Sequence, residues 1–226
     1  VNLASVLYLG SLALETIMGV PMVYGVMGLA LFAVAYSLYG GLSAVSWTDV
    51  IQVVFLIIGG MVTTYLALDT VSGGEGMWAG LSAIMDAAPD KFAMILDKSN
   101  PEYDNLPGIG VLVGGMWVAN LYYWGFNQYI IQRTLAAKSL KESQRGILFA
   151  AGLKLILPLI VVIPGIAAYV MTQDAAVMAG LGEAALNKPP TGANPDFAYP
   201  WLLQFLPTGL KGLAFAALAA AIVSSL

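Results

Sequence analysis

The sequence predicts an all-α membrane protein, and three observations lead to that prediction. Hydrophobic residues make up 59% of the 226 residues, charged residues make up 10%, and the mean hydropathy is +0.82. A soluble domain carries about 25% charged residues, so this chain lacks the polar residues needed to cover a water-facing surface. Its uncharged runs are long enough for helices, which satisfy their own backbone polar groups in hydrocarbon.

Six apolar runs approach the length of about 20 residues that a transmembrane helix needs. They are residues 1–18, 22–39, 50–68, 105–132, 146–172 and 208–226. The pair Gly40 and Gly41 is expected to form the turn between the second and third runs, because glycine adopts backbone angles that other residues avoid. The sequence therefore predicts six transmembrane helices, an outer segment 69–106 that contains a short helix, and a second outer segment 173–207.

The basic residues predict the orientation in the membrane. Within the short connection 133–145 lie Arg133, Lys138, Lys141 and Arg145. By the positive-inside rule this connection faces the cytoplasm. Counting the runs backward places the glycine turn and Asp49 on the same side, and the mostly acidic segments 69–106 and 173–207 on the outside.

Cysteine and histidine are both absent from the chain. Without cysteine there is no disulfide or thiolate metal site in it, and without histidine it lacks the usual general base and transition-metal ligand. We therefore expect the protein not to be an enzyme. The nine basic residues stand against thirteen acidic ones, which also argues against a nucleic-acid partner. Because the chain begins without Met and stops inside an apolar run, we expect it to be a piece of a larger protein.

Lys154 and Asn2 are polar side chains inside predicted helices, where burial is costly and a function is the first hypothesis. Lys154 lies roughly 12 Å beyond the cytoplasmic end of its run, at 1.5 Å per residue. Its amine can extend back toward the basic connection, or it can point into a watery cavity and donate hydrogen bonds to a hydroxyl-rich ligand. Asn2 can pair with a neighbouring helix, as asparagine often does in bundles, or it can bind a sugar hydroxyl.

Residues 117–128 are unusual for a transmembrane helix, because aromatic and amide side chains gather around Gly125 near the middle of the membrane. A tightly packed aromatic core or an interfacial belt is one interpretation. The other is a discontinuous helix that exposes backbone at the midplane, as in secondary transporters. Flat aromatic rings also suit the apolar face of a pyranose ring and can close behind it as a gate.

Small and hydroxyl residues end the last run. Ala221, Ser224 and Ser225 lie at i, i+3 and i+4, and therefore on one helical face. Their oxygens suit a small hard cation such as Na+, although the same residues are also common in helix packing. Asp49 precedes the run 50–68, where the helix dipole stabilises an acidic group, and where a carboxylate can attract a departing cation.

Four parts of the sequence carry a resemblance to a known family. They are residues 1–3 with 7–10, residues 39–52, residues 120–133 and residues 216–226. Together they resemble the solute:sodium symporter family, in its sodium/galactose and sodium/glucose branch, over essentially the whole chain. The resemblance implies a LeuT-like core of two inverted five-helix repeats in a multi-pass protein of the plasma (inner) membrane. Residues 1–68 would be the last three helices of the first repeat, and residues 107–226 the first three of the second.

The resemblance also implies the residues that bind a sugar of galactose or glucose type. Asn2 and Lys154 would donate hydrogen bonds to its hydroxyls. Asn120, Tyr123 and Trp124 would line the pocket, with Tyr123 stacked on the sugar ring as the inner gate.

A sodium ion is the second ligand that the resemblance implies. Ala221 would bind it through its carbonyl, Ser224 and Ser225 would bind it through their hydroxyls, and Asp49 would help it leave. The implied activity is sodium-coupled sugar symport by alternating access. Helices of both repeats lie outside this chain, so we expect the 226 residues to hold only part of each site and not to transport alone.

Other functions stay open at this point. A symporter for an amino acid or an organic anion would use Lys154 to bind a carboxylate, although Asn2 and the aromatic rings favour a neutral polyol. A membrane-embedded enzyme would have to rely on Asp49, Glu15 or Lys154, which the sequence places at different depths. A sugar sensor on the same fold would bind sugar without a sodium-dependent flux.

Overall fold

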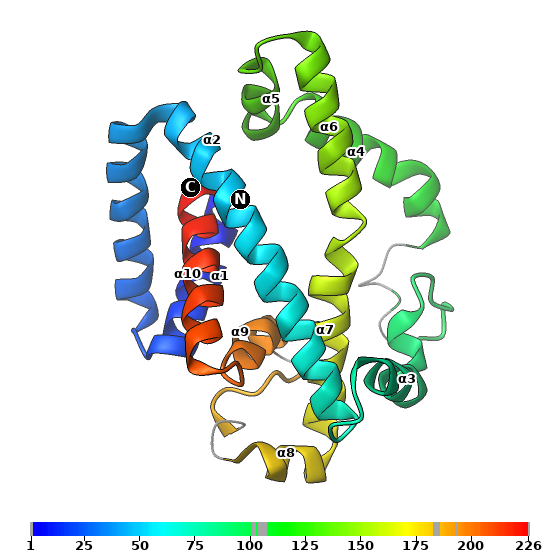
Figure 1. The fold of residues 1–226 in the computed structure, drawn as a ribbon. Helices are drawn as coiled ribbons and strands as arrows, with labels where there is room; N and C mark the ends of the chain where they lie inside the picture. Colours follow the sequence, from blue (N-terminus) through cyan, green and yellow to red (C-terminus); the bar gives the residue numbers. More distant parts are fainter. Residues whose placement is uncertain (1, 101–102, 104–107, 183–185, 193, 226) are drawn as a thin grey trace. The chain divides into compact units, whose positions relative to one another are not determined.

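The computed structural model describes residues 2–100, 103, 108–182, 186–192 and 194–225, without the side chains of residues 2, 42–45, 129 and 223–225. Nearly all of these residues are in helices or turns, as the sequence predicted (Figure 1). The chain divides into two compact units, which are Val1–Ala87 with Leu157–Leu226, and Ala88–Ile156. We describe each unit separately.

The larger unit begins with α1 (Asn2–Met18) and α2 (Met22–Val71). α2 consists of two helical arms joined by a bend, which Figure 1 shows where α2 passes from blue to cyan. At the bend Gly41 has φ +56° and ψ −173°, angles that favour glycine, so the predicted glycine turn is confirmed. The hydroxyls of Tyr36 and Thr48 form a hydrogen bond across this bend and tie the two arms together.

Further helices complete the larger unit. They are α3 (Met77–Ala87), α7 (Leu157–Gln173), α8 (Ala175–Leu181), the 3₁₀ turn η4 (Pro195–Phe197), α9 (Ala198–Leu203) and α10 (Thr208–Ser225). α10 packs against both α2 and α1, and α7 packs against α2. The Thr64 hydroxyl of α2 donates a hydrogen bond to the Leu159 carbonyl of α7 at 2.9 Å, which joins these two helices.

The segment between α7 and α10 folds back onto the helices of the larger unit. α9 carries the fully buried Trp201, and Leu203 of the same helix packs in a cluster with Leu206 and Ala214. The Lys188 amine lies 2.7 Å from a carboxylate oxygen of Glu15 on α1. The segment between α7 and α10 is therefore anchored to the helices by both apolar burial and an ion pair.

The smaller unit contains shorter helices. They are the 3₁₀ turn η1 (Pro89–Phe92), the π-helical turn η2 (Val111–Gly115), α4 (Met116–Gly125), α5 (Gln128–Leu135) and α6 (Leu140–Lys154). The predicted run 105–132 is therefore not one continuous helix. It breaks after Gly125, where Phe126 and Asn127 both donate their backbone N–H to the Tyr122 carbonyl.

Three helical stretches among the described residues are long and apolar enough to cross a bilayer. They are Met22–Gly41, Ser46–Val71 and Leu140–Gln173, and they coincide with the predicted helices over 22–39, 50–68 and 146–172. Shorter apolar helices, Leu3–Met18 and Thr208–Ile222, occupy the first and last predicted runs. The full set of six transmembrane helices and their LeuT-like arrangement stay predictions.

Candidate functional site

Three of the predicted sugar-binding residues meet in the smaller unit. The Nζ atom of Lys154 lies 4.5 Å from the centroid of the Trp124 ring and 5.0 Å from the centroid of the Tyr123 ring. The two rings contact each other edge to face, with centroids 5.4 Å apart and an interplanar angle of 87°. A hydrogen-bond donor and two aromatic rings therefore form one cluster of contacting side chains.

α4 presents its three predicted site residues on one side. Asn120, Tyr123 and Trp124 stand at i, i+3 and i+4, which places them on the same helical face. The Asn120 amide donates a hydrogen bond to the Met116 carbonyl one turn earlier, at 2.8 Å. This contact turns the amide toward the preceding turn of α4.

The end of α6 determines where Lys154 stands. Pro158 has no backbone N–H to donate to the carbonyl of Lys154 four residues earlier, and its ring crowds that carbonyl. α6 accordingly ends at Lys154, two residues form turns, and α7 begins at Leu157 with the proline in its first turn, where proline is tolerated. This break lies inside the run 146–172 that was predicted as one helix, and Pro158 is the signal in the sequence that predicts it.

The chemistry of this cluster is that of a cation over aromatic faces. Each such contact is worth about 0.5–1 kcal/mol at an exposed position. The Lys154 side chain is exposed and Tyr123 is 38% exposed, so neither the amine nor the phenol ring is closed off within this unit. Amine donors can bind hydroxyls, and an accessible ring can bind an apolar C–H surface.

The predicted sodium ligands lie on α10 of the larger unit. The helix continues through Ser225, so Ala221, Ser224 and Ser225 share one helical face, as the spacing predicted. Ala221 is half-buried. The side chains of Ser224, Ser225 and Asn2 lie outside the described residues, so their proposed contacts stay predictions.

Asp49 lies near the start of the second arm of α2. It is half-buried and directly follows Thr48, whose hydroxyl is bonded to Tyr36 of the first arm. Two features of the bend therefore fix the backbone at Asp49. They are the conformation of Gly41 and the hydrogen bond between Tyr36 and Thr48. No pattern in the sequence pointed to Tyr36.

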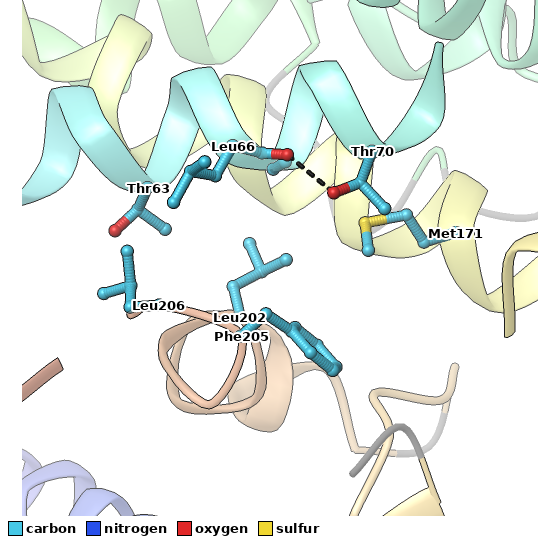
Figure 2. A pocket seen from close by; sticks show the side chains of 8 residues that line it. Thr63, Leu66, Thr70, Met171, Leu202, Phe205 and Leu206 are labelled. Carbon is cyan, nitrogen blue, oxygen red and sulfur yellow. Dashed lines mark hydrogen bonds between the residues drawn. The ribbon is translucent and has the colours of Figure 1, made fainter. Parts of the chain in front are cut away.

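A small cavity in the larger unit is separate from the predicted sites. It encloses about 70 Å³ between α2, α7 and the α9 region (Figure 2). The residues lining it are Thr63, Leu66, Ala67, Thr70, Met171, Leu202, Phe205 and Leu206. Pockets for small molecules usually span about 300–1,000 Å³, so this cavity is too small for a hexose. It contains none of the predicted site residues.

A profile of the family described as "Sodium:solute symporter family" matches residues 1–226. Among curated proteins, the chain is 68% identical over 226 residues to a sodium/glucose cotransporter of Vibrio parahaemolyticus, covering 100% of this chain and 42% of the relative. It is 34% identical over 235 residues to sodium/myo-inositol cotransporter 2 of Bos taurus, covering 97% of this chain and 34% of the relative.

A third relative is an uncharacterized symporter of Escherichia coli, which is 33% identical over 231 residues. The alignment covers 97% of this chain and 36% of the relative. The chain therefore spans less than half the length of each of these proteins.

Proposed function

Because the chain belongs to the sodium:solute symporter family, we propose that it forms part of a protein that couples sodium entry to uptake of a galactose- or glucose-type sugar. The observation that best supports the sugar is the meeting of Lys154 with the Tyr123 and Trp124 rings. The close relative named a sodium/glucose cotransporter supports the same substrate class.

The proposed sugar site matches the two kinds of surface on a pyranose. A pyranose presents hydroxyls around its edge and C–H groups on its faces. Tyr123 would stack on one face as the inner gate, beside Trp124. Lys154, Asn2 and Asn120 would hydrogen-bond the hydroxyls, the lysine as a donor and the amides as both donors and acceptors.

The contacts of Lys154 also indicate what sugar binding would change at this site. In the structure the amine lies over the two rings that a sugar would cover. Sugar binding would exchange this cation–π contact for hydrogen bonds to hydroxyls, so the amine would move from the ring faces to the ring edge of the ligand.

The proposed sodium site uses neutral oxygens. The Ala221 carbonyl and the Ser224 and Ser225 hydroxyls would bind Na+, with further ligands from helices outside this chain. Asp49 would attract the ion as it leaves toward the cytoplasm. Sodium binding would favour an outward-open state of a LeuT-like core, and that state would bind sugar. One charge that crosses about 100 mV supplies about 2.3 kcal/mol for uphill uptake.

A cyclic polyol is the second candidate substrate, because one relative is named a sodium/myo-inositol cotransporter. Inositol carries hydroxyls around a six-membered ring, as a hexose does, so the same amine and rings would suit it. An amino acid or organic anion would use Lys154 for its carboxylate but would leave the aromatic surface without a matching group.

The experiment is uptake of radiolabelled galactose by the full-length protein in proteoliposomes, with and without an inward sodium gradient. We expect accumulation only with the gradient. Unlabelled glucose should compete strongly, whereas unlabelled myo-inositol, alanine and lactate identify the alternative substrate classes. Accumulation that does not depend on sodium would contradict the coupling, and strong competition only by a non-sugar would contradict the substrate.

Variants of the same protein test the residues. Lys154→Ala and Tyr123→Ala should each lower the apparent affinity for sugar by about 10-fold or more, which corresponds to about 1.4 kcal/mol of lost binding. Tyr122→Ala is the matched control, because it removes the neighbouring phenol ring from a different face of α4. If all three variants have the same apparent affinity for sugar, the proposed sugar site is contradicted.

A further inference from the structure

Gly10 of α1 is buried against α10. A Cβ atom built on Gly10 would lie 2.8 Å from Ile222 Cγ2, 3.0 Å from Ile222 Cδ1 and 3.0 Å from Leu29 Cδ1. α1 and α10 lie side by side in the larger unit (Figure 1). The space that any other side chain would occupy at position 10 is therefore filled by Ile222.

Ile222 is held from more than one side. It packs against a cluster formed by Leu29 and Ala33 of α2, together with Leu7, Leu14 and Tyr36. Isoleucine is branched at Cβ and has one strongly preferred χ1 rotamer in a helix, so its Cγ2 atom cannot easily turn away. A methyl group at position 10 would therefore displace the backbone of α10 rather than only a side chain.

The residue beside Ile222 makes this contact relevant to function. Ala221 directly precedes it, and its carbonyl is a ligand of the sodium site proposed above. Ser224 and Ser225 follow within one turn of the same helix. A shift of the α10 backbone at position 222 would move the three proposed ligands together.

We infer that Gly10 is a positioning residue for sodium: its missing side chain lets Ile222 seat against α1 and so fixes the α10 backbone that carries the ion's ligands. This inference rests on the proposed sodium site. The same cluster extends to Tyr36, whose hydroxyl contacts Thr48 next to Asp49, the proposed exit residue. One group of packed side chains therefore connects the ligand helix with the bend of α2.

The test is sodium-dependent galactose uptake by the full-length protein in proteoliposomes. Gly10→Ala should raise the half-saturating sodium concentration by about 10-fold, the usual scale for a change that misplaces ion ligands. Maximal uptake at saturating sodium should stay close to that of the unmodified protein. A purely structural defect would instead lower maximal uptake and leave the sodium requirement unchanged, which would overturn the inference.

A matched control and a rescue variant separate packing from helix propensity. Gly28→Ala makes the same substitution inside α2, at a site where an added Cβ meets nothing within 4 Å, and should leave the sodium requirement unchanged. Adding Ile222→Ala to Gly10→Ala removes the collision, and the methyl group at position 10 then fills part of the space that Ile222 leaves, so the double variant should need less sodium than either single variant. If the Gly28 control raises the sodium requirement as much as Gly10→Ala, the inference is wrong.

Ile222→Ala alone tests the contact if Gly10→Ala does not fold. Losing the seated side chain should also raise the sodium requirement, and an unchanged requirement would overturn the inference. Ser225→Ala in the same assay separates this inference from the sodium site itself. If Ser225→Ala raises the sodium requirement but the Gly10 and Ile222 variants do not, the site stands and the positioning role fails. If Ser225→Ala has no effect, both fail.

Discussion

The amine of Lys154 lies 4.5 Å from the centre of the Trp124 ring, at the point where α6 ends. A cation in this position is attracted to the electron-rich face of the indole. The contact joins the C-terminal end of α6 to the C-terminal end of α4 within the smaller unit, and it involves two residues that the sequence had singled out for function.

A double-mutant cycle measures this contact in the full-length protein in detergent. Lys154→Met and Trp124→Leu, alone and together, should give a coupling free energy of unfolding of about 0.5–1 kcal/mol. Lys154→Arg should keep the coupling, since a guanidinium also stacks on indole. Thermal unfolding is the measurement. Single-variant effects that add to within about 0.3 kcal/mol would show that the amine and the ring do not interact.

The bend of α2 depends on glycine at position 41. Its positive φ of +56° strains a residue that has a Cβ, so Gly41→Ala should lower the free energy of unfolding by about 1–2 kcal/mol. Gly212→Ala in α10 is the control, because an added Cβ there meets nothing within 4 Å and helix propensity should improve stability by up to about 1 kcal/mol. The measurement is the midpoint temperature of thermal unfolding. A change in the same direction for both variants would contradict the special role of glycine at position 41.

The hydrogen bond between α2 and α7 should be measurable. Thr64→Val removes the donor to the Leu159 carbonyl while keeping the shape of the side chain, and should cost about 0.6–1.7 kcal/mol. Thr16→Val is the matched control, because that buried hydroxyl donates to Leu12 of its own helix at 2.8 Å. If both variants lose the same free energy of unfolding, the hydrogen bond between α2 and α7 contributes no more than a bond within one helix.

Burial raises the pKa of Tyr199 on α9 above its ordinary value of 10.0, and a hydrogen bond with Thr63 lowers it by less. The unfolded chain therefore loses this phenol proton at a lower pH than the folded protein does. By linkage, the contribution of Tyr199 to the free energy of unfolding is fully present below about pH 10. It is lost as the pH rises through the pKa of the folded state.

Thermal unfolding from about pH 9 to about pH 11 checks this sign. Tyr199→Phe should show a smaller decline in stability over that interval than the unmodified protein. Tyr39→Phe serves as the control, because Tyr39 is 96% exposed. A decline in Tyr199→Phe as steep as in the unmodified protein would show that this phenol does not contribute to the alkaline loss of stability.

Much of the fold followed from local chemistry in the sequence. The glycine pair predicted the bend of α2, because only glycine adopts the required φ without strain. Long uncharged runs predicted the helices Met22–Gly41 and Ser46–Val71. The helix break before Pro158 was also within reach, since a proline removes a defined hydrogen bond four residues earlier. Hydropathy alone predicts one helix over 146–172, because it is continuous across the proline.

The remaining part depended on contacts between distant segments. Lys154 and Trp124 are 30 positions apart in the sequence, and periodicity within either helix does not reveal that they meet. Gly10 had been noted only within a family motif, because its importance comes from Ile222, which is more than 200 positions away. The Tyr36 contact with Thr48 likewise follows from the bend and not from spacing.

Because of Trp201, α9 and α8 differ in how well they would accept a label. Because this ring is fully buried in α9, that helix is unsuited to an inserted epitope tag or a surface label, either of which would have to expel an indole from the packed interior. α8 has no buried residue and begins with a self-contained cap in which Asp174 accepts from Ala176 and Val177. An antibody fragment that binds α8 would therefore not need to displace any buried side chain of that helix.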